Sequence, residues 1–137
     1  SVQAQILNLM LSLREKHNLT ILFIAHDLSV VEYLCDEVVV LYLGKVVEWG
    51  NAKEVYSNPQ HPYTRALLSA VPIPDPGANI DREILKGDMP SPLSPPSGCV
   101  FRTRCKFADV KCLEIIPPTV NINDGHSAAC LKLGELK

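Results

Sequence analysis

The amino-acid sequence predicts an α/β fold with an incomplete sheet, followed by a small irregular module rich in cysteine. Helical and apolar strand-like segments alternate over residues 1–58, which is typical of a parallel sheet with crossover helices. Because a helix comes first and a parallel sheet needs strands on both sides of each crossover, we expect the sheet to be incomplete at its N-terminal edge. Residues 59–98 are predicted to hold a helix and a Pro-rich tether, and residues 99–137 to form a four-cysteine C-terminal module.

The first predicted element is an amphipathic helix over residues 2–17. Its apolar side chains recur at three- and four-residue spacing, namely Val2, Ile6, Leu9, Met10 and Leu13. Ser1 is a suitable N-cap, and Asn18 is a residue type that ends helices in the left-handed conformation. The sequence therefore predicts both ends of this helix.

Two apolar runs follow, and both have the composition of strands buried on both faces. They are LTILFIA at residues 19–25 and EVVVLYL at residues 37–43. A second helix is predicted between them, from residue 27 to residue 34 or 35. Gly44 then makes a turn into residues 45–49, so that the second run and these residues form a hairpin.

The segment after the hairpin predicts two further helices and then a tether. Residues 51–56 read as a short helix capped by Asn51, and residues 62–71 as a helix with Pro62 at its first position. Residues 73–98 are rich in Pro, Gly and Ser, so we expect them to cross a surface in extended form.

His26 directly follows the first apolar run and precedes a predicted helix. Ligands of open α/β sheets bind at the carboxyl ends of strands, where a histidine can reach a phosphate or a polarised water. On position by itself, the better interpretation is a boundary residue satisfied by local hydrogen bonds. Asp27 is expected to be the N-cap of the following helix, and His61 has no evident partner in the sequence.

Three segments resemble a known family: IAHDL around His26, the hairpin LYLGKVVEWG, and HPYTRALLSAVP from His61. Together they look like the end of an ABC transporter ATP-binding subunit, in particular of the oligopeptide/dipeptide importer family. The resemblance implies that His26 is the switch histidine, which binds the cofactor ATP and acts in catalysis. In that role it holds the γ-phosphate and positions the attacking water.

The phosphate-binding segments of such a subunit are not found in this sequence. It contains no G-x-x-x-x-G-K-[ST] loop, no LSGGQ-like signature, and no apolar strand that ends in Asp-Glu. The resemblance therefore implies a C-terminal part cut just after the D-loop, which should not hydrolyse ATP without the rest of the subunit. It also implies ATP and Mg²⁺ in the full-length parent, membrane permease subunits and a second ATP-binding subunit as partners, and a peripheral location on the cytoplasmic face of the membrane.

Four cysteines, Cys99, Cys105, Cys112 and Cys130, are separated by five, six and seventeen residues. Such a set binds a metal or cluster, forms disulfides, or remains as free thiols. The reducing compartment implied by the family disfavours disulfides, and zinc sites prefer closer pairs. Some members of the family look to carry a four-iron cluster on this set, so we prefer [4Fe-4S], with zinc as the alternative. His126 is expected near the cluster as a hydrogen-bond donor to a sulfur, or as an alternative ligand.

Charge and composition exclude some functions. The formal net charge is −2, which argues against a nucleic-acid-binding surface. Four basic residues lie near the cysteines and would stabilise an anionic cluster: Arg102, Arg104, Lys106 and Lys111. The rival to a transport ATPase subunit is a non-catalytic metal-binding or redox-sensing module on a degenerate α/β scaffold.

Overall fold

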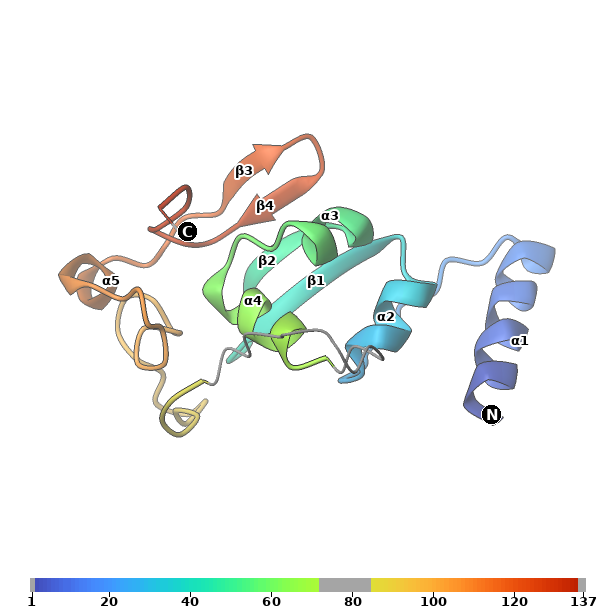
Figure 1. Cartoon of the computed structure of the whole chain (residues 1–137), viewed down its shortest axis with the longest axis horizontal. Coiled ribbons are helices and arrows are strands. Elements are labelled where there is room, and N and C mark those ends of the chain that lie inside the picture. Colours follow the sequence, from blue (N-terminus) through green and yellow to red (C-terminus); the bar gives the residue numbers. More distant parts are fainter. Residues whose placement is uncertain (1, 72–84, 136–137) are drawn as a thin grey trace, which may run out of the picture.

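The computed structural model describes residues 2–71 and 85–135. The described elements are, in chain order, α1 (Val2–His17), α2 (Leu28–Leu34), β1 (Glu37–Tyr42), β2 (Lys45–Asn51), α3 (Ala52–Ser57), α4 (Pro62–Ser69), α5 (Val110–Glu114), β3 (Val120–Asn123) and β4 (His126–Ala128) (Figure 1). The predicted cap Ser1 and the tether up to residue 84 lie outside the described residues. No helix in the described ranges is long and apolar enough to span a membrane.

The four described strands form one antiparallel sheet in the order β1-β2-β4-β3. The hairpin predicted from residue 37 to residue 49 is confirmed, but the expected parallel sheet is wrong for the described strands. The turn explains the direction of β1 and β2, because Leu43 and Gly44 both have positive φ, 48° and 73°, as in the tight turns that join antiparallel strands.

Strand β1 is buried on one face only, which corrects the expectation that it is buried on both. Val38, Val40 and Tyr42 point into the core, whereas Val39 and Leu41 are exposed. This alternation is typical of an antiparallel sheet that packs on one side. The apolar character of the run therefore did not indicate which of its residues lie in the core of this chain.

The strand predicted over residues 19–25 is also wrong in this structure. The segment has no regular secondary structure, and Leu22 and Ile24 are each 89% exposed. A strand is stabilised by hydrogen bonds to a neighbouring strand, and no strand in the described part of the chain pairs with this segment. The segment therefore has a composition that favours strands but no neighbouring strand with which to pair.

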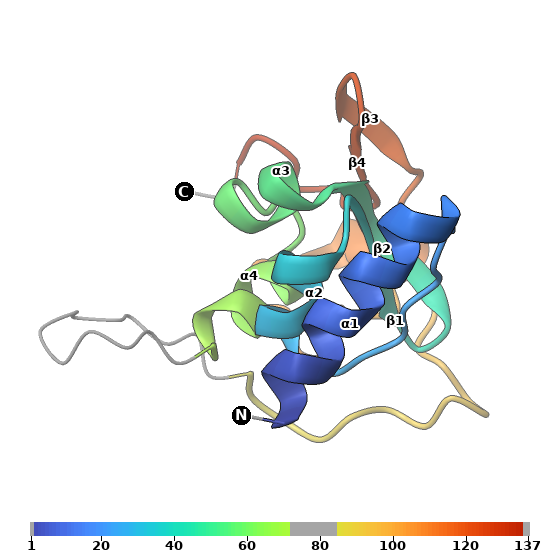
Figure 2. The ribbon, with the colours of Figure 1, turned by 90° about the vertical axis from the view of Figure 1, so that its right-hand side faces the viewer.

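The two predicted N-terminal helices are confirmed, together with Asn18 at the end of α1 and Asp27 as the N-cap of α2. Asn18 has φ 49° just beyond α1, and Asp27 Oδ1 accepts the Ser29 N–H of α2 at 3.0 Å. Figure 2 shows α1 beside α2. Arg14 Nη1 lies 3.2 Å from Asp36 Oδ2, so an ion pair joins α1 to the start of the sheet region.

The helices that follow the hairpin are confirmed, and the C-terminal module is more regular than expected. Asn51 Oδ1 caps α3 by accepting the Lys53 N–H at 3.0 Å, and Pro62 opens α4. Residues 85–98 contain no helix or strand. The module that was predicted to be irregular contains α5 and a second hairpin, and β4 of this hairpin pairs with β2. The module therefore extends the same sheet.

One apolar core joins the first hairpin to the cysteine module. Its buried members are Val38, Val40, Tyr42, Val47, Ala52, Val55, Cys99, Phe101 and Cys112. Phe101 is at the centre of the aromatic contacts, with ring centroids 5.1 Å from Tyr42, 5.3 Å from Tyr63 and 5.6 Å from His61. These contacts fix the cysteine loop against β1 and α4.

Candidate functional site

His26 lies in a bend between the exposed apolar segment and α2, and its side chain is exposed. The next residue, Asp27, caps α2 as expected. An exposed imidazole at this position is open to a ligand. This geometry does not test the catalytic role of His26, which stays a prediction.

The four cysteines of the module lie in one region as free thiols. Cys99, Cys112 and Cys130 are buried and Cys105 is half-buried. The Cys99 N–H donates to the Cys112 carbonyl at 2.9 Å. Gly98 permits this approach, because it has φ 62° and a Cβ there would lie 2.5 Å from the Cys112 oxygen. The loop and α5 thereby bring two cysteines together.

Burial is the main influence on the pKa of three of these thiols. It raises the pKa of Cys99, Cys105 and Cys130, the last to about 11, and the neighbouring thiols raise the pKa of Cys130 further. The three thiols are therefore protonated at neutral pH, and a metal would have to displace their protons. Among the described residues, no group of three or more His, Cys, Asp or Glu side chains is placed to hold a metal ion. The predicted metal site is thus not formed in this structure, and it stays a prediction.

A buried carboxylate, Glu48, has three polar partners from different parts of the fold. Its side chain is 0% exposed. Oε1 accepts the Gln60 N–H at 2.7 Å and lies 2.8 Å from His126 Nε2, while Oε2 accepts the His61 N–H at 2.8 Å. The carboxylate therefore joins β2, β4 and the N-terminus of α4, where the helix dipole favours negative charge.

A β-bulge explains why Glu48 points inward. Val40 pairs with Glu48 and Leu41 pairs with Val46, which leaves Val47 as an extra residue on β2. Val47 and Glu48 are consequently both buried. Sequence reasoning missed Glu48 because a charged residue in an alternating strand is expected on the exposed face; the only signal was its position within the apolar run VVEW.

The structure gives the two histidines around Glu48 roles that differ from the expected ones. His126 was expected beside a cluster sulfur, but its Nε2 contacts the carboxylate, and its buried Nδ1 has no hydrogen-bond partner among the described residues. His61 Nδ1 caps α4 by accepting the Tyr63 N–H at 3.1 Å. Burial lowers the pKa of His61 to about 4, so this ring is neutral at pH 7.

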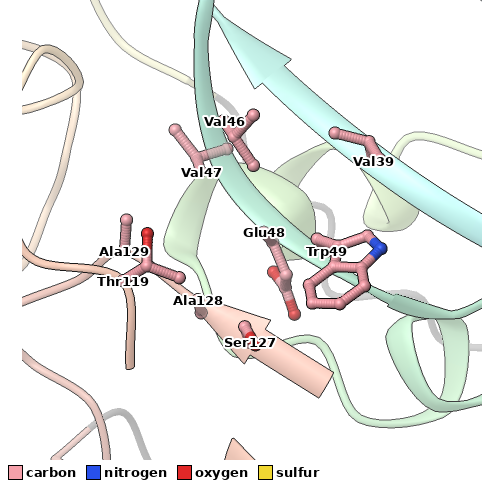
Figure 3. Close-up of a pocket in the computed structure, with 9 residues that line it drawn as sticks. All are labelled: Val39, Val46, Val47, Glu48, Trp49, Thr119, Ser127, Ala128 and Ala129. Atoms are coloured by element: carbon pink, nitrogen blue, oxygen red, sulfur yellow. The ribbon is translucent and has the colours of Figure 1, made fainter. Parts of the chain in front are cut away.

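A mainly apolar hollow of about 280 Å³ lies beside β2 and β4 (Figure 3). It is lined by Val39, Val46, Val47, Glu48, Trp49, Thr119, Ser127, Ala128 and Ala129. None of the predicted site residues lines it. Its single titratable side chain is Glu48, whose carboxylate already has three partners.

Comparison with known proteins shows which family the middle of the chain matches. Residues 47–112 match the family model of the oligopeptide/dipeptide transporter, C-terminal region. These residues carry the C-terminal region of that transporter family. The resemblance inferred from the sequence motifs is therefore confirmed. The matched part of the family begins within β2 and ends at Cys112, so it includes Glu48 and His61 but neither His26 nor Cys130.

Relatives of the family align along nearly the whole chain. One relative is a Brucella ovis protein that is provisionally named a peptide import ATP-binding protein. It is 54% identical to this chain over 132 residues, and the alignment covers 96% of this chain and 42% of that protein. The oligopeptide transport ATP-binding protein OppF of Haemophilus influenzae is 53% identical over 97% of this chain and 41% of its own length. OppF of Escherichia coli K12 is 51% identical over 99% of this chain and 41% of its own length. The chain thus spans about two fifths of these relatives.

Proposed function

We propose that this chain is the C-terminal part of an ATP-hydrolysing subunit that energises the import of oligopeptides, dipeptides or related small solutes. The observation that carries the proposal is the similarity of 96–99% of the chain to proteins named for peptide import or oligopeptide transport. The exposed apolar segment at residues 19–25 is consistent with it, since a β-forming run that lacks a partner here would pair within a larger sheet. The rest of the α/β domain would then supply the neighbouring strands.

Within such a subunit, His26 would hold the γ-phosphate and position the attacking water. Its place directly after the apolar segment supports this role, because ligands bind at the carboxyl ends of strands in open α/β sheets. ATP and Mg²⁺ would be bound mainly by parts of the parent outside this chain. The parent would work with membrane permease subunits and a second ATP-binding subunit, on the cytoplasmic face of the membrane, without nucleic acid.

Replacing His26 with Ala in the full-length parent tests this function. We expect ATP turnover to fall by about 10²–10³-fold while ATP binding persists, because one charge-stabilising contact of the transition state is lost. His17→Ala, at an exposed position on α1, is the control and should hydrolyse ATP normally. Near-normal turnover by the His26 variant would reject the role.

The second part of the proposal is that Cys99, Cys105, Cys112 and Cys130 hold a [4Fe-4S] cluster, with zinc as the alternative. Four thiols are a suitable donor set for either group, and Cys130 lies close enough to the other three for them to raise its pKa in addition to the effect of burial. When bound, the group would staple the module or respond to redox state. The loop before α5, α5 itself and the turn after β4 carry the four cysteines that would bind the cluster or the zinc.

Anaerobic purification distinguishes the cofactors. A four-iron cluster predicts a brown protein with about four irons per chain, and loss of colour when any one of the four cysteines is changed to Ser. Cys35→Ser is the control and should keep the colour, because Cys35 precedes β1, far in sequence from the other four cysteines. One tightly held zinc would support the alternative, and a metal-free protein with four titratable thiols would reject both.

A further inference from the structure

Cys130 is the cysteine that is most distant in sequence from the others, so its position depends on contacts outside the short loop. It follows β4 by two residues. The β4 strand is paired with β2, and the Ala129 N–H donates to the Val47 carbonyl at 2.9 Å, which carries the pairing up to the residue before Cys130. The His126–Glu48 contact, 2.8 Å long and buried on both sides, fixes the start of the same strand. Cys130 is thus held on its N-terminal side.

An ion pair holds the chain on the C-terminal side of Cys130. Lys132 Nζ lies 2.6 Å from Asp109 Oδ2, and Asp109 Oδ1 accepts the Cys112 N–H at 3.2 Å as the N-cap of α5. The backbone N–H of Lys132 also donates to Cys130 Sγ at 3.3 Å. One lysine therefore contacts the sulfur of Cys130 and the residue that caps the helix bearing Cys112.

We propose that the His126–Glu48 and Lys132–Asp109 pairs are positioning devices that hold Cys130 in the same region as Cys112 and the other thiols in the metal-free chain. This inference rests on the proposed four-cysteine site and names the residues that keep its two segments together. None of the four residues needs to touch the metal. Their contribution is to connect the two segments that carry the cysteines, since seventeen residues lie between Cys112 and Cys130.

Thiol cross-linking in the metal-free full chain tests the inference without depending on metal. A short bifunctional thiol reagent such as dibromobimane joins cysteines that are close in space, and peptide mapping by mass spectrometry identifies the joined pair. The reaction is run at about pH 9, because the thiolate is the reacting form. A Cys35→Ser background removes the fifth free thiol. We expect the unaltered module to give cross-links from Cys130 to one of the other three cysteines.

Two substitutions remove the Lys132–Asp109 pair, which is half-buried, while leaving the local backbone contacts. Lys132→Met keeps the backbone N–H that donates to Cys130, and Asp109→Asn keeps an oxygen that can cap α5. Each should lower the yield of Cys130 cross-links about two- to fivefold, the range expected for an ion pair near the surface. Glu135→Gln is the matched control, because Glu135 also lies near Lys132 Nζ, at 3.4 Å, but on the same turn rather than on α5. Its yield should not change.

The buried pair has its own variants. His126→Phe removes one of the three partners of the buried Glu48 carboxylate and the only one on β4, so it should reduce Cys130 cross-links more than about tenfold. His126→Gln can restore an N–H donor and should recover part of the yield. In every variant the Cys99–Cys112 cross-link, which reports on the loop itself, distinguishes a displaced Cys130 from an unfolded module.

Selective loss of the Cys130 cross-links, with the Cys99–Cys112 cross-link retained, would support the inference. Absence of Cys130 cross-links in the unaltered chain would overturn it, as would normal yields in both Lys132→Met and His126→Phe. The proposed cofactor is tested by a different result: it is rejected if a protein with normal cross-linking takes up neither iron nor zinc.

Discussion

At the scale of single residues, the most informative positions are polar side chains buried under the sheet. Glu48, His61 and His126 are each no more than 1% exposed. A buried polar group is tolerated when it has partners, and loss of one partner costs about 1–3 kcal/mol or more. The three residues therefore specify how β2, β4 and α4 come together, in addition to the apolar packing around Phe101.

His61 predicts a loss of stability in mild acid. Its pKa is about 4 in the folded chain against 6.5 when unperturbed, because burial disfavours the charged ring. Between these pH values the unfolded chain binds a proton that the folded chain does not. The free energy of unfolding should therefore be fully present above pH 6.5 and fall by up to about 3 kcal/mol as the pH drops towards 4. Urea unfolding across this range measures it.

His61→Asn isolates the effect, because Asn can cap α4 but does not titrate. The variant should show a flatter pH dependence than the unaltered chain between pH 4 and 6.5. His17→Asn, at an exposed position, should keep the original slope. An unchanged slope in His61→Asn would mean that other groups cause the acid sensitivity.

Gly50 gives a second prediction at this scale. A Cβ at this position would lie 2.6 Å from the Gly125 carbonyl oxygen and 3.0 Å from His126 Cα, both backbone atoms. Gly50→Ala should therefore disturb the β2–β4 pairing and lower the free energy of unfolding by about 1–3 kcal/mol. Gly44→Asn is the control, because nothing lies within 4 Å of a Cβ there and Asn tolerates positive φ. Equal stability of the two variants in urea would contradict the close approach.

At the scale of elements, local signals succeeded for the helices α1 to α4 and for the β1–β2 hairpin, and they failed for the apolar run at residues 19–25. Asn18, Asp27 and Asn51 mark helix ends in the sequence and in the structure, because capping is a contact between residues close in the chain. The apolar run at residues 19–25 formed no strand, because a strand also needs a neighbour that the local sequence does not contain.

Hydrogen exchange tests this difference between elements. The backbone amides of residues 20–25 should exchange close to the rate of an unfolded chain, since they belong to no described helix or strand. The amides of β1 and β2 that bond across the hairpin should be protected in the same sample. Mass spectrometry of peptic fragments gives both rates. Strong protection of residues 20–25 in the isolated chain would contradict the structure.

At the scale of the whole molecule, the cysteine module and the first hairpin share one core. Phe101 is 1% exposed and contacts aromatic rings from β1 and α4. The boundary predicted at residue 99 therefore lies within a packed region. Whether residues 99–137 can fold separately stays a prediction, and a shared core favours unfolding as a single unit.

Phe101→Ala tests how far the core is shared. We expect it to lower the free energy of unfolding by about 3–5 kcal/mol, because it leaves a cavity between β1, α4 and the cysteine loop. Phe107→Ala, at a half-buried position, should cost less. Calorimetry should give one transition for the unaltered chain, whereas two separate transitions, with Phe101→Ala affecting only one, would show that the module folds independently.

The sequence by itself determined the caps Asn18, Asp27 and Asn51, the helices α1 to α4, the β1–β2 hairpin and the family. These features depend on residues that are close in the chain or on motifs such as HPYT and IAHDL. The position of His26 after an apolar run was also readable, although its role was implied only by the resemblance. The four cysteines were evident as a set from their density.

Only the tertiary structure decided the order of the strands in the sheet, the burial of the Glu48 side chain and the contacts on either side of Cys130. The β2–β4 pairing joins residues about 80 positions apart, as Glu48 and His126 are 78 residues apart, and no local pattern specifies such a contact. A one-residue bulge leaves two successive residues of β2, Val47 and Glu48, both buried. Side-chain partners across the fold, rather than composition, thus determine which polar groups in this chain are buried and what they connect.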